Sequence, residues 1–211
     1  MRLKIDRYQE QAPSWPSDGR HILAQFADRE IVVYQAFHHS IASFAVSHQR
    51  FGGEFSFDRM SWIKPNFLWM MYRCGWASKQ GQERVLAVHI RRKFFDSVLA
   101  LAVETYFVPE IHGDRENHRG ALDASPVRLQ WDPDHDPAGR PLERRAIQLG
   151  LKGEVLKEYA SKAIVEIEDI TEFVIGQRRS ATAGDWKTLL TPAEKSYLPT
   201  DGEIRAKIRL D

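Results

Sequence analysis

DRMSWIKPNFLWMMYRCGWA, from Asp58 to Ala77, holds three of the six tryptophans of the chain together with a Lys-Pro step and an arginine. Proline lacks a backbone N–H and is tolerated in the first turn of a helix, and it drives the residue before it towards extended geometry. The stretch therefore predicts a short strand over MSWIK, followed at Pro65 by a helix over PNFLWMMYRCGW.

Helical spacing gives the predicted helix two different sides. The apolar side, expected in the core, consists of Phe67, Met70, Met71 and Cys74. The second side carries Asn66, Trp69, Arg73 and Trp76. Aromatic rings beside a cation can hold a planar, anionic ligand such as a nucleotide. In the alternative interpretation, Trp69 and Arg73 stack on each other and close the core, because amphipathic side chains often cover apolar surface.

Strand and helix patterns continue on both sides of this stretch. Strands are predicted at 30–37, the first buried strand, and at 84–90, 127–131, 145–151 and 163–171. Helices are predicted at 38–49, 93–103, 153–160 and 171–179. A short turn or helix is expected at 21–29, and exposed polar loops are expected at 109–125 and 132–141.

The predicted fold is therefore α+β, with six or seven strands and four or five helices. We expect a polar N-terminal arm over residues 1–20 and a single α+β domain over residues 21–211. A mixed, mainly antiparallel sheet with flanking helices fits this order of elements.

Composition excludes several classes of protein. The net charge of +1, from 30 basic and 29 acidic residues, argues against a strongly basic nucleic-acid coat. The apolar runs are shorter than a membrane span, and the charged N-terminus lacks an apolar signal core, so we expect a cytoplasmic protein without a membrane partner. With a single cysteine and no HExxH motif, no disulfide and no metal are expected.

Polar side chains inside strand patterns mark a second set of candidates. Lys64 falls where the predicted strand meets the helix, whose free N–H groups favour an anion; the alternative is a solvated lysine in a turn. Tyr34 and Gln35, and later Arg145 and Gln148, lie in runs that look buried. Such groups either bond to each other or line a cleft.

The segments VVYQAF, FSFDRMSWIKPNFLWMMYRCGWA, QERVLAVHI and RAIQLGL together resemble a family of bacterial and fungal proteins of about 200 residues, which is known only as a domain of unknown function. The resemblance covers residues 30 to 171, and its long tryptophan-rich motif is specific. It implies no established activity.

The order of elements around Tyr34 and Gln35 is also similar, more distantly, to the NAD-binding half of ADP-ribosyltransferases. This resemblance implies a split sheet and NAD or another nucleotide as ligand. This sequence has Gln35 where those enzymes carry Arg or His, and Gln148 where they carry a catalytic Glu. The catalytic residue is therefore left unassigned.

These observations predict a nucleotide-binding, ADP-ribosyltransferase-like protein that acts as a transferase on a nucleotide or nucleic-acid substrate. In this hypothesis Tyr34 and Gln35 position the ligand, and Gln148 lies beside them. Trp62 and Trp69 stack on the ligand, and Lys64, Arg73 and Arg145 neutralise its phosphates. The alternatives are a non-catalytic module for single-stranded nucleic acid and a protein-interaction module whose exposed tryptophans bind a partner.

Overall fold

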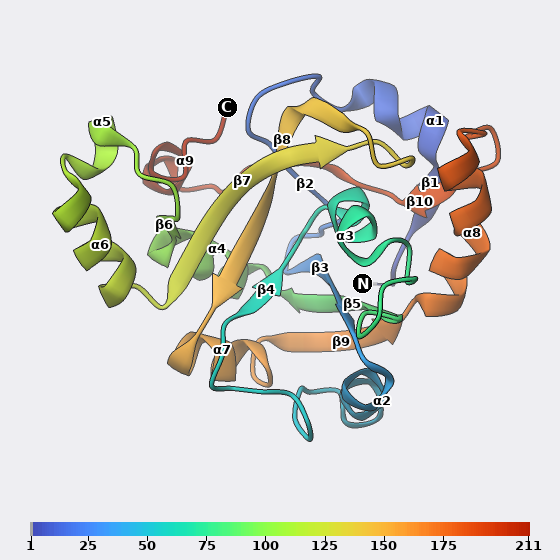
Figure 1. Cartoon of the computed structure of the whole chain (residues 1–211), viewed down its shortest axis with the longest axis horizontal. Coiled ribbons are helices and arrows are strands. Elements are labelled where there is room, and N and C mark those ends of the chain that lie inside the picture. Colours follow the sequence, from blue (N-terminus) through green and yellow to red (C-terminus); the bar gives the residue numbers. More distant parts are fainter. Residues whose placement is uncertain (1) are drawn as a thin grey trace.

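Two β-sheets that meet at strands β3 and β4 form the centre of the molecule (Figure 1). The computed structural model describes residues 2–211. The first sheet is antiparallel, in the order β3 (Glu30–Phe37), β5 (Arg84–Arg91) and β9 (Ile164–Asp169). The second has the order β4 (Ser61–Ile63), β8 (Pro141–Leu151), β7 (Val127–His135) and β6 (Val103–Glu104), and only its β6–β7 pair is parallel.

A backbone bridge between Tyr34 and Lys64 joins the two sheets. The Tyr34 N–H donates to the Lys64 carbonyl at 2.7 Å, and the Lys64 N–H donates to the Tyr34 carbonyl at 3.3 Å. Lys64 is the first residue after β4, so the chain makes this bridge immediately before it enters helix α3 (Phe67–Cys74). The expected α+β fold with mainly antiparallel pairing is confirmed.

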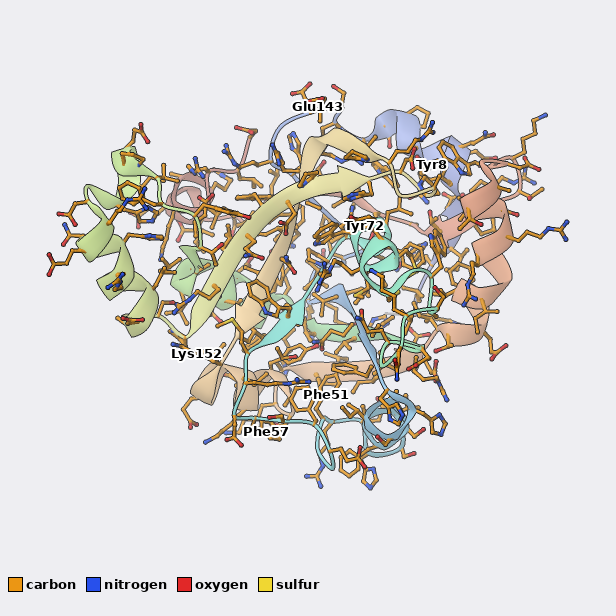
Figure 2. The ribbon with its side chains drawn as sticks, viewed as in Figure 1. Tyr8, Phe51, Phe57, Tyr72, Glu143 and Lys152 are labelled. Carbon is orange, nitrogen blue, oxygen red and sulfur yellow. The ribbon has the colours of Figure 1, made fainter. Side chains whose placement is uncertain are left out.

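The first sheet separates two hydrophobic clusters, because strand side chains alternate between the two faces. One cluster takes Val33 and Leu86 and packs against α4 (Arg92–Leu101). The other takes Val32 and Tyr34 and packs against α3 and α8 (Thr171–Ala183). Side chains fill the interior between these layers (Figure 2). Among residues 2–211, no helix combines the length and the apolar character that a bilayer span requires.

The remaining helices cover the periphery of the sheets (Figure 1). Their bounds are α2 (His39–His48), α7 (Gly153–Tyr159) and α9 (Gly202–Lys207). Residues 2–211 form nine α-helices and eleven strands, more than the sequence predicts. The surplus consists largely of elements of two to four residues, which are too short to display a periodicity.

The N-terminal segment, predicted as a polar arm, contains regular secondary structure. β1 (Ile5–Arg7) pairs with β10 (Leu190–Pro192), and two short helical turns follow, α1 (Tyr8–Gln11) and η1 (Ala12–Ser14). The rings of Tyr8 and Trp15 are buried. A few well-spaced aromatic residues thus hold a mostly polar segment against the core.

Residues 21–29 also differ from the expected turn or helix. Their central part is strand β2 (Ile22–Ala24), which pairs with β11 (Lys195–Tyr197). All three residues of β2 are buried, so the segment shows no polar alternation. Because its partner strand is about 170 positions away along the chain, no local pattern marks the pairing.

Two predicted loops are regular elements. Within 109–125 lie α5 (Pro109–His112) and α6 (Arg115–Ala124), with the Asp114 side chain accepting from the Asn117 N–H at 2.8 Å as the N-cap of α6. Only His118 of α6 is buried, so the helix has no apolar stripe to reveal it.

The aspartate-rich segment after Trp131 continues strand β7 as far as His135. The register shifts between Pro133 and His135, which accommodates the proline. Asp134 is buried and accepts from the Arg144 Nε at 2.9 Å and from its Nη2 at 2.6 Å. This buried ion pair across the β7–β8 ladder explains why an acidic, proline-containing run forms a strand.

Candidate functional site

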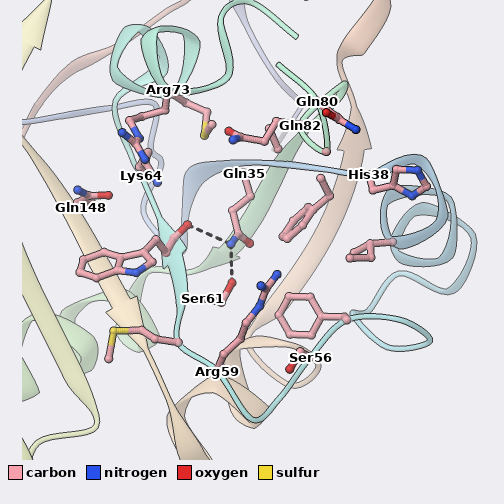
Figure 3. Close-up of a pocket in the computed structure, with 18 of the residues that line it drawn as sticks. Gln35, His38, Ser56, Arg59, Ser61, Lys64, Arg73, Gln80, Gln82 and Gln148 are labelled. Atoms are coloured by element: carbon pink, nitrogen blue, oxygen red, sulfur yellow. Dashed lines mark hydrogen bonds between the residues drawn. The ribbon is translucent and has the colours of Figure 1, made fainter. Parts of the chain in front are cut away.

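A cleft of about 750 Å³ opens beside the joint between the two sheets (Figure 3). Its walls come from the end of β3, the segment that precedes β4, helix α3 and the loop before β5. Gln130 of β7 and Gln148 of β8 complete it. The cleft thus lies where residues distant in sequence meet, and it includes part of the tryptophan-rich stretch.

The lining of the cleft is basic. Arg59, Lys64 and Arg73 line it, and among the described residues no aspartate or glutamate does. Among the described residues, His38 is the only histidine in the lining, which contains no cysteine. Cations without carboxylates produce a positive potential inside a concave surface, so this arrangement favours an anionic ligand.

Lys64 is the most unusual of these cations. Its exposed fraction is only 6%, and within residues 2–211 its ammonium makes no ion pair or hydrogen bond. Burial and, to a smaller extent, the nearby charge of Arg73 together lower the pKa of Lys64 to about 8, and the charge of Asp132 opposes the shift. A buried ammonium without a counter-ion is unfavourable, and a bound anion would relieve it.

Arg73 comes from the exposed side of helix α3, and it lies next to Lys64 in the cleft (Figure 3). The helix starts two residues later than Pro65 suggests, because the side chain of Asn66 is the N-cap and accepts from the Trp69 N–H at 2.6 Å. Arg59 approaches from the other side of Gln35. Two cations therefore share one end of the cleft and a third lies apart from them.

Gln35 lines the cleft, but its side-chain amide is hydrogen-bonded to other residues of the protein. Its Nε2 donates to the Ser61 Oγ at 2.9 Å and to the Trp62 carbonyl at 3.1 Å, and its Oε1 accepts from the Tyr159 hydroxyl at 2.6 Å. These bonds tie β3 to β4 and to α7. Gln35 thus holds the wall of the cleft in place.

Trp62 and Gln148 also line the cleft, as expected. Trp62 lies over Gly150 of the neighbouring strand, where an added Cβ would come within 3.0 Å of the Trp62 Cε2 and 2.9 Å of the Met60 Cγ. The absence of a side chain at Gly150 therefore makes room for the indole ring of Trp62. Gln148 donates from Nε2 to the Asp132 Oδ2 at 2.7 Å and to the Gln130 Oε1 at 2.8 Å.

Three candidates lie outside the cleft lining. Tyr34 is fully buried on the opposite face of β3, with its ring centroid 5.4 Å from that of Phe67. Its hydroxyl has no hydrogen-bond partner among the described residues. Arg145 is exposed on β8, and its N–H donates to the Gly19 carbonyl at 2.7 Å.

Trp69 is buried and stacks on other rings. Its centroid lies 5.2 Å from that of His135 and 5.4 Å from that of Tyr72. The expectation that Trp69 helps to close the core is met, but its stacking partners are these two rings instead of Arg73.

Ser61, Gln130 and the loop glutamines Gln80 and Gln82 also line the cleft, and none of them is among the eight candidate ligand residues. Arg59 lies within the tryptophan-rich stretch, which draws attention to it. The segment before β4 has no helical or strand periodicity, however, so the sequence does not predict where the Arg59 side chain points. Loop side chains are positioned by tertiary contacts, so only their position next to a distinctive motif pointed to them.

The profile of a family described as a domain of unknown function, DUF4291, matches residues 21–197. The chain belongs to the DUF4291 family. The matched part runs from just before β2 to the end of β11 and contains every element that lines the cleft. No curated protein matches the chain. The resemblance to an uncharacterised family is therefore confirmed, whereas similarity to ADP-ribosyltransferases is not shown.

Proposed function

We propose that this DUF4291 protein binds a nucleotide in the cleft and acts on a nucleotide or nucleic-acid substrate. The observation that carries the proposal is Lys64, a buried lysine whose ammonium makes no ion pair among residues 2–211 and which lines the cleft beside Arg73. A phosphate group supplies the missing charge and accepts hydrogen bonds from both side chains.

The size and the other walls of the cleft suit such a ligand. Its volume of about 750 Å³ falls within the usual range for small-molecule sites, roughly 300 to 1,000 Å³. Trp62 offers an aromatic surface for a base, and Gln80, Gln82 and Gln148 offer amide groups for its polar edge. In this arrangement the phosphate would lie against Lys64 and Arg73, and the base would stack on the indole ring of Trp62.

Transfer of ADP-ribose from NAD is the narrower form of the proposal. Such a reaction requires a group that stabilises a positive ribosyl centre. Two carboxylates are hydrogen-bonded to residues of the lining: Asp132 accepts from the Gln148 Nε2 at 2.7 Å, and Glu83 accepts from the Gly81 N–H at 2.8 Å. Analysis of the products formed from NAD tests this form separately from binding.

The first test is nucleotide affinity in the full chain, measured by calorimetry with NAD, ADP-ribose and ATP. We expect at least one of them to bind, and Arg73→Ala to weaken its binding about tenfold, since a charged hydrogen bond contributes roughly 1.5 kcal/mol or more. Arg119→Ala is the matched control, because Arg119 is an exposed arginine of α6 outside the cleft lining.

Other outcomes separate the alternatives. Salt-sensitive binding of short single-stranded RNA or DNA, without affinity for mononucleotides, would replace the proposal with the nucleic-acid-binding module. If no nucleotide and no oligonucleotide binds, the proposal fails and the protein-interaction hypothesis remains. Equal losses in both arginine variants would mean that the effect is one of net charge.

A further inference from the structure

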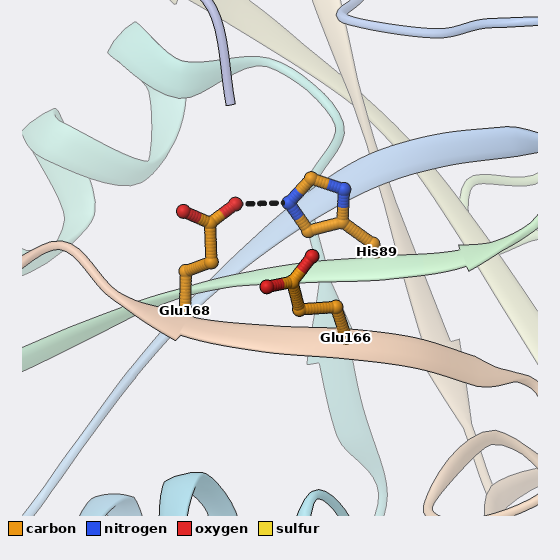
Figure 4. Close-up of side chains that lie close together, drawn as sticks. All are labelled: His89, Glu166 and Glu168. Atoms are coloured by element: carbon orange, nitrogen blue, oxygen red, sulfur yellow. Dashed lines mark hydrogen bonds and ion pairs between the residues drawn. The ribbon is translucent and has the colours of Figure 1, made fainter. Parts of the chain in front are cut away.

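His89, Glu166 and Glu168 form a compact cluster (Figure 4). The strand registers place it on the face of the first sheet opposite Gln35. Register produces this cluster: His89 of β5 pairs directly with Glu166 of β9, and Glu168 pairs with Ala87, two residues along the strand. Side chains at these positions share one face. One nitrogen and two carboxylate oxygens from the three residues all lie within 4.8 Å of one another.

The imidazole of His89 is held in one orientation. Its side chain has no exposed surface, and its Nε2 lies 2.6 Å from the Glu168 Oε1. Its buried Nδ1 has no hydrogen bond within residues 2–211, although the Glu30 Oε2 lies 3.9 Å away. A fully buried ring nitrogen with an unused bond is unfavourable. The cluster as it stands therefore leaves one polar atom unsatisfied.

The charge of the cluster is also unbalanced. Within residues 2–211 neither Glu166 nor Glu168 forms an ion pair with a lysine or an arginine, and Glu168 is bonded to the imidazole of His89. Glu168 additionally accepts from the Leu3 N–H at 3.2 Å. Two carboxylates around one imidazole present more negative charge than that ring can neutralise.

We propose that this cluster binds one divalent transition-metal ion, Mn²⁺ or Zn²⁺, through the Nε2 of His89 and the carboxylates of Glu166 and Glu168. One imidazole with two carboxylates suits these ions better than Mg²⁺ or Ca²⁺, which take oxygen ligands. Metal on Nε2 fixes the tautomer with the proton on Nδ1, directed towards Glu30. Metal-binding histidines are usually oriented by a carboxylate in this way.

The proposed site lies on the opposite face of the sheet from the cleft, so it does not depend on the nucleotide proposal. Metal there would hold β5 to β9, next to the N-terminal segment that contacts Glu168. The sequence alone does not reveal this proposed metal site, because His89 and Glu166 are 77 positions apart and belong to no linear motif.

The test uses the full chain, stripped of metal with a chelator and titrated with MnCl₂ and with ZnCl₂. We expect one ion per chain, a higher melting temperature, and a ¹⁴N coupling in the pulsed electron paramagnetic resonance spectrum of the Mn²⁺ form, which reports imidazole coordination. Glu166→Gln should weaken binding at least tenfold. Because Glu166 is exposed, this variant should keep the melting temperature of the metal-free protein.

Glu158→Gln is the matched control, since Glu158 is an exposed glutamate of α7 outside the cluster. Its affinity should equal that of the unmodified chain. The proposal is overturned by failure of both ions to bind at one per chain, by equal affinity in Glu166→Gln, or by a bound Mn²⁺ without nitrogen coupling. None of these outcomes bears on nucleotide binding.

Discussion

The two faces of the β3–β5–β9 sheet carry opposite chemistry. On the side of Gln35 lies a cleft lined by three cations and by no aspartate or glutamate among the described residues. On the other side, two carboxylates converge on the buried imidazole of His89. One strand thickness separates them, because neighbouring strand residues point in opposite directions. The two proposed sites, one for an anion and one for a cation, therefore use opposite faces of a single sheet and keep their charges apart.

Residues on or near the cleft side differ in their burial and in their hydrogen bonds. Lys64 is buried without an ion pair and is only partly compensated by Asp132, Gln35 is buried with hydrogen bonds at both ends of its amide, and Gly150 gives room to a neighbouring ring. Tyr34, next to Gln35 in sequence, points to the other face and into the core. Their substitution should therefore have separable effects, and each effect tests the distinction between the two faces.

The largest expected effect is the pH dependence of stability that Lys64 produces. Its pKa is about 8 in the folded chain and 10.5 ordinarily, so the unfolded chain binds more protons between these values. Stability should therefore rise with pH across this window, by up to about 3 kcal/mol at 1.36 kcal/mol per unit. Urea unfolding from pH 7 to 10.5 should show this rise in the difference between the unmodified chain and Lys64→Met, because the raised pKa values of Cys74 and of the buried tyrosines lower the stability of both proteins alike at high pH.

Lys187→Met is the control for that experiment, because Lys187 is an exposed lysine outside the cleft. It should keep the rise. If the free energies of unfolding of Lys64→Met and of the unmodified chain depend on pH in the same way, the Lys64 ammonium is not desolvated. The contrast between the two faces of the sheet would then lose its main support.

Gln35→Ala should lower the free energy of unfolding by about 2 to 3 kcal/mol. It removes the bonds to Ser61 and Trp62 and leaves the buried Tyr159 hydroxyl without its acceptor. Tyr159→Phe, which removes only one of these bonds, should have a smaller effect. Urea unfolding measures both; a loss below 1 kcal/mol for Gln35→Ala would show that the amide does not hold the wall.

Gly150→Ala should destabilise by about 1 to 2 kcal/mol, since the new methyl group meets the Trp62 ring and the Met60 side chain. Displacement of the indole should also weaken the binding of any base that stacks on it. Gly120→Ala is the control: it lies in α6 with open space around it, where alanine favours the helix. Equal melting temperatures for the two variants would contradict the close packing of Trp62 against Gly150.

Tyr34→Phe should have the smallest effect. The lost hydroxyl is buried without a hydrogen bond among the described residues, so its removal should leave stability unchanged or raise it by at most about 1 kcal/mol. Nucleotide affinity, measured by calorimetry, should not change. A tenfold loss of affinity would place Tyr34 functionally on the cleft side, against its position in the core.

The sequence predicts those parts of the molecule whose patterns are local. Strand β5 and the apolar stripe of α3 are recovered, and five of the eight candidate ligand residues line one cleft, namely Gln35, Trp62, Lys64, Arg73 and Gln148. Periodicity cannot tell which face of a strand or helix meets a cleft, which is why Tyr34 and Trp69 were included. Helix α6 and the end of β7 depend on a cap and a buried ion pair, which no hydrophobic period records.

The bridge between Tyr34 and Lys64 couples recognition to architecture. The same residue that offers an ammonium to the cleft also supplies, through its backbone, the hydrogen bonds that join the two sheets. An anion that fixes the Lys64 side chain therefore stiffens the seam between the sheets. The exchange rates of the Tyr34 and Lys64 amide hydrogens should fall on ligand binding, so these two amides can serve as a built-in gauge of occupancy.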